Sequence, residues 1–256
     1  MPSETAPAEV KLIPAEHQVL EQIAMFGFTV EEAVASLPTS QGEGRRGVVQ
    51  LLNRMGKRRL IRYENLYHGR ECIRLGPRGE QAMRSRSIPM RFHCRPLSEE
   101  SKIRALALLS FCTLSDVHRV PLRADSGRES WSNCYIEITP ERRMGFLRVD
   151  MGGRGRWDRI LAKCEHDAKS IREDPRFTES LGTGRAELSL AVTLPHKAER
   201  LRQVLQDHPL PIPIRIIVIP ELLYLIAPPP EPQSATRTFK PPNPGQINSL
   251  SFQEQK

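Results

Sequence analysis

The feature that most constrains the fold of this 256-residue chain is a change in the spacing of its apolar residues near Gly56. Before this point, apolar residues recur at helical spacing over residues 14–27 and 45–56. After it, residues 60–63 and 72–75 alternate between apolar and polar, with the polar run NLYHGR between them. The sequence therefore predicts helices followed by a two-stranded hairpin.

A short additional helix is predicted between the two longer ones. Thr29 is a typical N-cap residue, and Glu31 and Glu32 follow it in the first turn, where carboxylates favour the positive end of the helix dipole. Three short helices and a hairpin are the order of a winged helix-turn-helix, predicted here over residues 14–86. The closing run IRLGPRGEQAM resembles the second wing strand and the following helix start of many such domains.

The charge of the chain reverses within this predicted domain. Residues 1–42 carry one Lys and six Glu, whereas residues 43–95 carry fourteen Lys or Arg and four Glu. A change of sign over so short a distance indicates a surface that faces a polyanion. The alternatives are a solvated basic face without a partner and a winged helix that serves protein contact or dimerisation.

Double-stranded DNA is the partner that the third helix favours. In a helix-turn-helix the second helix of the pair lies in the major groove, where Arg reads guanine edges and Asn or Gln reads adenine. Basic residues after this helix and at the wing tip would contact phosphates or a minor groove. The predicted DNA-contacting residues are Arg45, Arg46, Gln50, Asn53, Arg54, Lys57, Arg58, Arg62, His68 and Arg70.

The rest of the chain predicts a second, mixed α/β domain. Residues 1–13 are expected to be a loose leader and residues 87–97 a linker. Over residues 98–227, a helix, three short strands, and then helix, strand, helix and strand alternate, which implies a partly parallel sheet. The proline-rich, polar residues 228–256 are expected to be disordered. The predicted fold class is therefore α+β or α/β.

The order of elements in this second domain resembles a PD-(D/E)xK, restriction-endonuclease-like core. Together with the winged helix, the chain resembles the replication-relaxation family of plasmid and integrative-element proteins, to which MobC-type relaxases are related in concept. The motif region is NCYIEITPERRMGFLRVDMGGRGRWDRILAKCEHD. The resemblance implies two carboxylates at adjacent strand ends that hold Mg²⁺ against a scissile phosphate, with a Lys that helps to place the water.

This chain departs from that family pattern at the residues that would bind the metal. Ser132-Asn133 stands where Pro-Asp is expected, and Arg148-Val149-Asp150 stands where Glu-x-Asp is expected. The remaining catalytic candidates are Glu137, Asp150 and Lys163, with Asp158 and Glu165 as further possibilities on the next helix. Glu137 and Asp150 also fit ordinary polar strand-end residues, and Arg148 would repel Mg²⁺ but could contact a phosphate directly. We therefore expect a degenerate core without catalysis, no cofactor, and Mg²⁺ only if the core is an active nuclease.

These features together predict a cytoplasmic DNA-binding protein of a plasmid or integrative element that acts in replication, mobilisation or transcriptional control, with homodimerisation as a possible role of the second domain. The alternatives are a metal-dependent nicking endonuclease or relaxase, and an adaptor that recruits a protein through its C-terminal tail. Five widely spaced cysteines without a CxxC pair argue against a disulfide framework and against structural zinc. No apolar run approaches the roughly 20 residues of a membrane span, so no membrane contact is expected.

Overall fold

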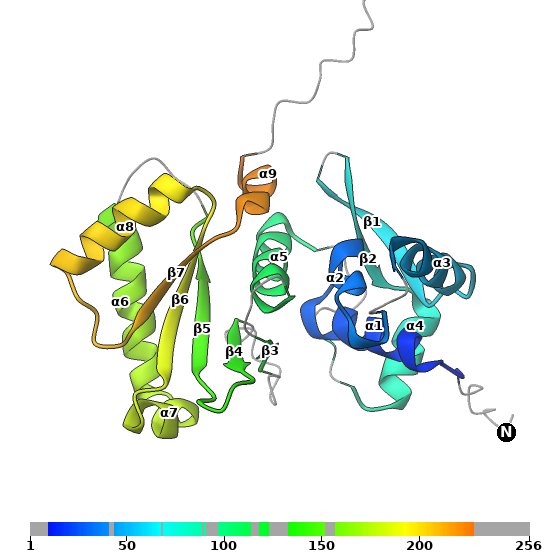
Figure 1. The fold of residues 1–256 in the computed structure, drawn as a ribbon, viewed down its shortest axis with the longest axis horizontal. Helices are drawn as coiled ribbons and strands as arrows, with labels where there is room; N and C mark the ends of the chain where they lie inside the picture. The colour runs from blue at the N-terminus through cyan, green and yellow to red at the C-terminus, as the bar shows by residue number, and fades with distance from the viewer. Residues whose placement is uncertain are drawn as a thin grey trace, which may run out of the picture.

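The computed structural model describes residues 10–40, 44–67, 69–88, 90, 97–113, 118–122, 133–151 and 157–227 (Figure 1). The predicted linker lies largely outside these ranges, and the predicted tail lies wholly outside them. Of the predicted leader, residues 10–13 are described, and they are not loose. Val10 is 4% exposed and belongs to the core, and the carbonyl of Lys11 accepts a hydrogen bond from Arg58 at 2.5 Å. This part of the leader prediction is wrong because Val10 fills a space beside the first helix.

The N-terminal unit has the order of elements that the sequence predicts. Its helices and strands are α1 (Pro14–Phe26), α2 (Glu31–Ala35), the 3-10 turn η1 (Pro38–Ser40), α3 (Gly44–Lys57), β1 (Ile61–Tyr67), β2 (Arg70–Leu75) and α4 (Pro77–Ser85). Gly27, at φ 89°, ends α1 in the left-handed conformation that glycine adopts without strain. Strands β1 and β2 form an antiparallel hairpin.

Thr29 has a different role from the one predicted. The residue that precedes α2 is Val30, which makes no side-chain cap. The backbone of Thr29 instead exchanges hydrogen bonds with Ile73 at 2.9 and 2.8 Å, so it adds a short bridge to the hairpin. Its hydroxyl donates to Gln22 Oε1 at 2.7 Å, within the core. The capping prediction is wrong because the hydroxyl is already used by a partner on α1, which local sequence does not reveal.

The C-terminal unit is built on a five-stranded mixed sheet. Its elements are α5 (Glu99–Thr113), β3 (Arg119–Pro121), β4 (Cys134–Glu137), β5 (Met144–Val149), α6 (Trp157–Glu173), η3 (Pro175–Phe177), α7 (Thr178–Gly182), β6 (Ala186–Val192), α8 (Pro195–Asp207), β7 (Ile214–Val218), η4 (Pro220–Leu222) and α9 (Leu223–Ile226). The strands follow chain order, with β3, β4 and β5 antiparallel and β5, β6 and β7 parallel. The expectation of a partly parallel sheet is confirmed.

Helices cover both faces of this sheet (Figure 1). On one face, Leu188 and Leu190 of β6 pack with Cys164 of α6 and Leu201 of α8. On the other face lies α5, which is buried from Ala105 to Cys112. A helix that is apolar around its whole circumference requires partners on every side.

Helix α5 also joins the two units. A single hydrophobic cluster contains Phe28 and Leu66 from the N-terminal unit, Leu106 from α5, and Leu147 and Ala191 from the sheet. In Figure 1, α5 lies between the N-terminal unit and the sheet. The two units that the sequence predicts therefore share a core, and the position of α3 is fixed relative to the sheet.

Candidate nucleic-acid interface

Helix α3 is amphipathic, and its buried side attaches it to the N-terminal unit. Val48, Leu51, Leu52 and Met55 are each at most 4% exposed and pack against α1 and the hairpin. These positions repeat at three- and four-residue intervals, so they share one side of the helix. The opposite side of α3 must therefore face away from the core.

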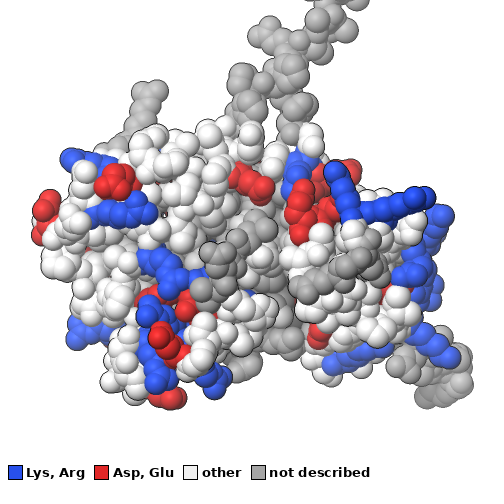
Figure 2. Space-filling view, viewed as in Figure 1, with Lys and Arg blue, Asp and Glu red and all other residues white. Residues whose placement is uncertain are grey.

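Four side chains suited to DNA contact occupy that opposite side. Arg46, Gln50, Asn53 and Lys57 follow one another at intervals of four, three and four residues, and all four are exposed. We call these four residues the α3 stripe. Within the described part of the chain, none of them forms an ion pair or a side-chain hydrogen bond. In Figure 2, basic side chains gather at the outer side of the N-terminal unit, over the region of α3. The stripe thus has two positive charges and two amides free to meet a ligand.

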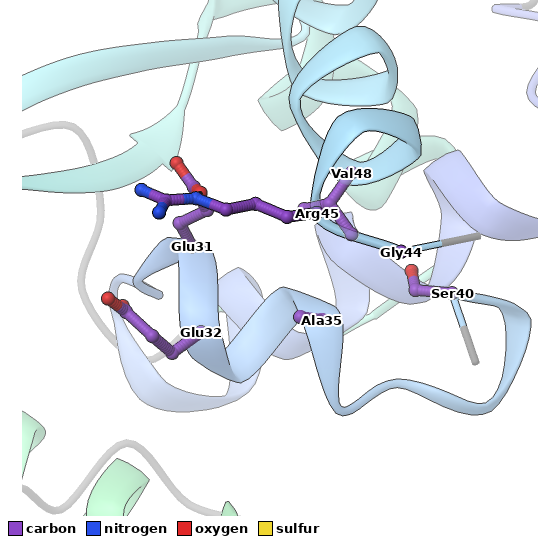
Figure 3. A pocket seen from close by; sticks show the side chains of 7 residues that line it. All are labelled: Glu31, Glu32, Ala35, Ser40, Gly44, Arg45 and Val48. Carbon is purple, nitrogen blue, oxygen red and sulfur yellow. The ribbon is translucent and has the colours of Figure 1, made fainter. Parts of the chain in front are cut away.

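Two other predicted DNA contacts are paired with acidic residues of α2. Arg45 Nε lies 3.0 Å from Glu31 Oε1, and Arg70 Nη2 lies 2.5 Å from Glu32 Oε2. Figure 3 shows Arg45 extending from the start of α3 toward Glu31. A pocket of about 420 Å³ lies between α2 and the start of α3, and Ser40 also lines it. Arg45 is the one basic residue among the described residues that line this pocket, and it is already paired with Glu31, so the pocket offers a phosphate little positive charge.

Three more of the predicted arginines support the fold. Glu16 is fully buried at the start of α1, and both of its oxygens accept from Arg58 Nη1, at 2.7 and 2.6 Å. Arg54 Nε lies 3.4 Å from the same carboxylate, although the Arg54 side chain is 53% exposed. Arg62 pairs with Glu64 at 2.9 Å. The contacts of Arg54 and Arg58 anchor the end of α3, and Arg62 is paired within β1, so these three arginines are weaker candidates than the α3 stripe.

The tip of the hairpin lies against the C-terminal unit. The ring of Tyr67 stacks on Tyr224 of α9, with 5.1 Å between the ring centres and 16° between the planes. Arg70, the first residue of β2, is held by Glu32. His68, the remaining residue predicted at the tip, lies outside the described residues. The contact with α9 leaves less of the hairpin available to DNA than a free wing would offer.

The catalytic candidates do not meet in one place. The backbone N–H of Glu137 donates to the carbonyl of Arg143, which directly precedes β5, whereas Asp150 directly follows the end of β5. Seven residues of extended chain separate these positions by roughly 20 Å. Lys163 is exposed on α6, and the described residues contain no ion pair between it and either carboxylate. A shared metal centre made of Glu137, Asp150 and Lys163 is therefore ruled out by the geometry.

At one end of the sheet, the motif region holds ion pairs between its acids and bases. Asn133 accepts the N–H of Leu147 through its carbonyl at 2.8 Å, which places the start of β4 beside Arg148. Arg148 forms a bidentate salt bridge with Asp167 of α6, in which Nη2 lies 2.5 Å from Oδ1. Asp150 Oδ2 lies 3.1 Å from Lys197 Nζ of α8. The Arg148 guanidinium therefore has a carboxylate partner already, which weakens the expectation that it contacts a phosphate.

A buried polar network at the other end of the sheet accounts for Glu137. Oε1 of Glu137 accepts from Arg119 Nη2 at 2.7 Å and from Arg215 Nη1 at 3.0 Å. Arg215 also reaches Glu187 at 3.2 Å, and Glu187 accepts from the hydroxyl of Tyr135 at 2.6 Å. Burial, followed by the charge of Glu187, raises the pKa of Tyr135 well above its ordinary value of 10.0.

This network was not foreseen from the sequence. Tyr135, Glu187 and Arg215 stand on separate strands, up to 80 residues apart, and only the pairing of those strands brings them together. One signal was available: a charged residue inside each of two largely apolar strands, Glu187 in AELSLAV and Arg215 in IRIIV. Such residues are costly to bury unless they are paired. No cluster of His, Cys, Asp and Glu suitable for a metal ion occurs among the residues described.

Comparison with known proteins gives no relative: no family model, curated protein or solved structure matches this chain. Within the described ranges, no helix is long and apolar enough to span a membrane.

Proposed function

We propose that this chain binds double-stranded DNA by inserting α3 into the major groove, with the α3 stripe as the contact surface. The observation that carries the proposal is the stripe itself. Arg46, Gln50, Asn53 and Lys57 lie opposite the buried side of α3, which takes the place of the second helix in the proposed helix-turn-helix, and they form no ion pair with any described residue. Gln50 and Asn53 present the amide groups that read adenine, and each good base contact is worth about 1–3 kcal/mol of discrimination. Arg46 and Lys57, at the two ends of the stripe, would contact phosphates or guanine.

In this proposal the C-terminal unit supports DNA binding without catalysis. Its order of helix, three antiparallel strands, helix and parallel strand is compatible with a nuclease-like core and hence with the resemblance to the replication-relaxation family. The protein would then act in the cytoplasm, on a plasmid or an integrative element. The same unit gives no support to metal-dependent nicking, because Asp150 is paired with Lys197 and Glu137 with two arginines. The adaptor role of the tail stays a prediction, since residues 228–256 are outside the described ranges.

The proposal is tested by titrating DNA binding against salt. The unchanged chain and the double variant Arg46→Ala/Lys57→Ala are compared on a short mixed-sequence duplex. Two lost phosphate contacts reduce the slope of log Kobs against log salt by about 2. The matched control is Arg172→Ala, which removes an exposed charge from α6 in the C-terminal unit. Unchanged affinity and slope in the double variant would exclude the α3 stripe as the interface, and an equal loss in the control would move the interface to the sheet unit.

A second variant separates base reading from phosphate contact. Gln50→Ala/Asn53→Ala keeps both charges of the α3 stripe, so binding to mixed-sequence DNA should change little. When each protein is used to select duplexes from a random pool, the unchanged chain should enrich a defined site, and the variant should lose that preference. Equal enrichment by both proteins would show that these amides do not read bases.

A further inference from the structure

Strand β7 forms one edge of the five-stranded sheet. It pairs with β6 along its whole length, and no described strand pairs with its other side. All five of its residues, Ile214 to Val218, are half-buried. In Figure 1 no described element lies across it. The opposite edge strand, β3, has only three residues and ends in Pro121, so the sheet has one short edge and one longer, apolar edge.

The hydrogen bonds to β6 show which backbone groups of β7 remain available. Leu188 donates its N–H to the carbonyl of Pro213 at 2.9 Å, and Ile219 donates to Val192 at 2.8 Å. In a parallel ladder, alternate residues direct both backbone groups to the same neighbouring strand. The odd-numbered residues of β7 therefore serve β6. The N–H and C=O groups of Ile214, Ile216 and Val218 point outward, away from the sheet.

This edge has none of the features that usually prevent pairing between sheets. Such features are lysines, bulges, prolines within the strand, or a charge that a new strand would bury. The register of β6 and β7 is continuous, without a bulge. The only charged residue of β7, Arg215, is already neutralised by Glu137 and Glu187, so covering it would not bury a bare charge.

We propose that β7 pairs antiparallel with β7 of a second copy of this chain, about a two-fold axis at Ile216, to form one continuous sheet. The outward-facing residues are self-complementary about that axis. Ile216 then stands opposite Ile216 of the second copy, and Ile214 of each copy stands opposite Val218 of the other. Every cross-strand pair therefore joins two apolar, β-branched side chains. Each such pair exchanges two backbone hydrogen bonds.

The flanking residues favour a symmetric partner over a longer foreign strand. β7 begins at Ile214, and Pro220, just beyond its end, cannot donate to a ladder, so the outward-facing backbone groups that can pair are few and centred on Ile216. A short strand alone buries less than the roughly 1,600 Å² of a standard interface. Helix α8 packs beside β7, so its exposed side would come alongside α8 of the second copy and extend the interface. This inference rests on the sheet edge and is independent of the proposed DNA binding.

The test measures mass and amide exchange on the full chain without DNA. Light scattering should give twice the 29.1 kDa of one chain at high concentration and fall toward one chain on dilution. In hydrogen exchange, the amides of Ile214, Ile216 and Val218 should be protected only at the high concentration. The amides of Arg215 and Ile217 should stay protected throughout, because they bond to β6. A single-chain mass at every concentration would overturn the proposal, as would protection at the outer amides that does not change on dilution, which would indicate an occupant from the same chain.

A variant pair gives an independent check. Ile216→Pro removes an N–H that bonds to none of the described residues, and proline is tolerated on an edge strand when its N–H would face solvent. The variant should keep the circular dichroism spectrum of the fold and become a single chain. Ile216→Val keeps the N–H and should remain paired. If Ile216→Pro folds and keeps the doubled mass, β7 is not the contact; if it does not fold, the exchange measurement on the unchanged chain decides.

Discussion

Replacing Glu16 by alanine should destabilise the whole chain, because its carboxylate holds the first helix to the end of α3. Glu16 is fully buried and accepts two bonds from Arg58, and it also accepts the N–H of Ile13 at 3.2 Å. Removing one partner of a buried ion pair costs about 3–5 kcal/mol. The Arg58 side chain is 33% exposed and can recover some hydration, so we expect a loss near the lower end, about 3 kcal/mol.

The measurement is unfolding by urea at neutral pH, followed by circular dichroism. In thermal unfolding of a chain of this size, a loss of about 3 kcal/mol in the free energy of unfolding corresponds to a fall in melting temperature of roughly 6–12 °C. Glu21→Ala is the matched control, since Glu21 lies on the same helix in a part-exposed contact with His17 at 3.4 Å. That control should change the unfolding free energy by no more than about 0.5 kcal/mol.

A double-mutant cycle isolates the contact. Glu16→Ala, Arg58→Ala and the double variant should give a coupling energy of about 1.5–3 kcal/mol, because the two side chains touch directly. A coupling energy near zero, or a Glu16→Ala variant no less stable than Glu21→Ala, would refute the reasoning that this buried carboxylate anchors α3.

Three further predictions concern Gly145 and Tyr135 in the sheet and Gly56 in α3. A Cβ at Gly145 would lie 2.3 Å from the Tyr135 hydroxyl, which Glu187 and Ser189 hold in place, so Gly145→Ala should cost about 3 kcal/mol or more in thermal unfolding. Gly56→Ala, in an open helical position, should instead stabilise by about 0.4–1 kcal/mol. The raised pKa of Tyr135 means that the unfolded chain loses this proton above pH 10 while the folded chain keeps it. Stability should therefore fall by about 1.4 kcal/mol per pH unit above pH 10 on account of this group, and Tyr135→Phe should remove that part of the slope; an unchanged slope would contradict the assignment.

The local sequence determined the elements and the amphipathic character of α3. Val48, Leu52 and Met55 recur at helical spacing, and that spacing alone places Arg46 and Asn53 on the opposite side. The all-round apolar character of residues 105–112 was also visible, and it could have indicated a helix buried between two units. Such patterns can be read from sequence because they depend on neighbours within one or two turns.

Tertiary structure alone decided which charged residues remain available for binding. Arg58 meets a carboxylate 42 positions away, and Arg70 meets one 38 positions away, so neither pairing has a local signature. Likewise, Glu137 and Asp150 are close in sequence, yet the antiparallel turn between β4 and β5 places them at opposite ends of the sheet. Periodicity specifies which side of an element a residue occupies, whereas the direction and register of distant elements specify what that residue meets.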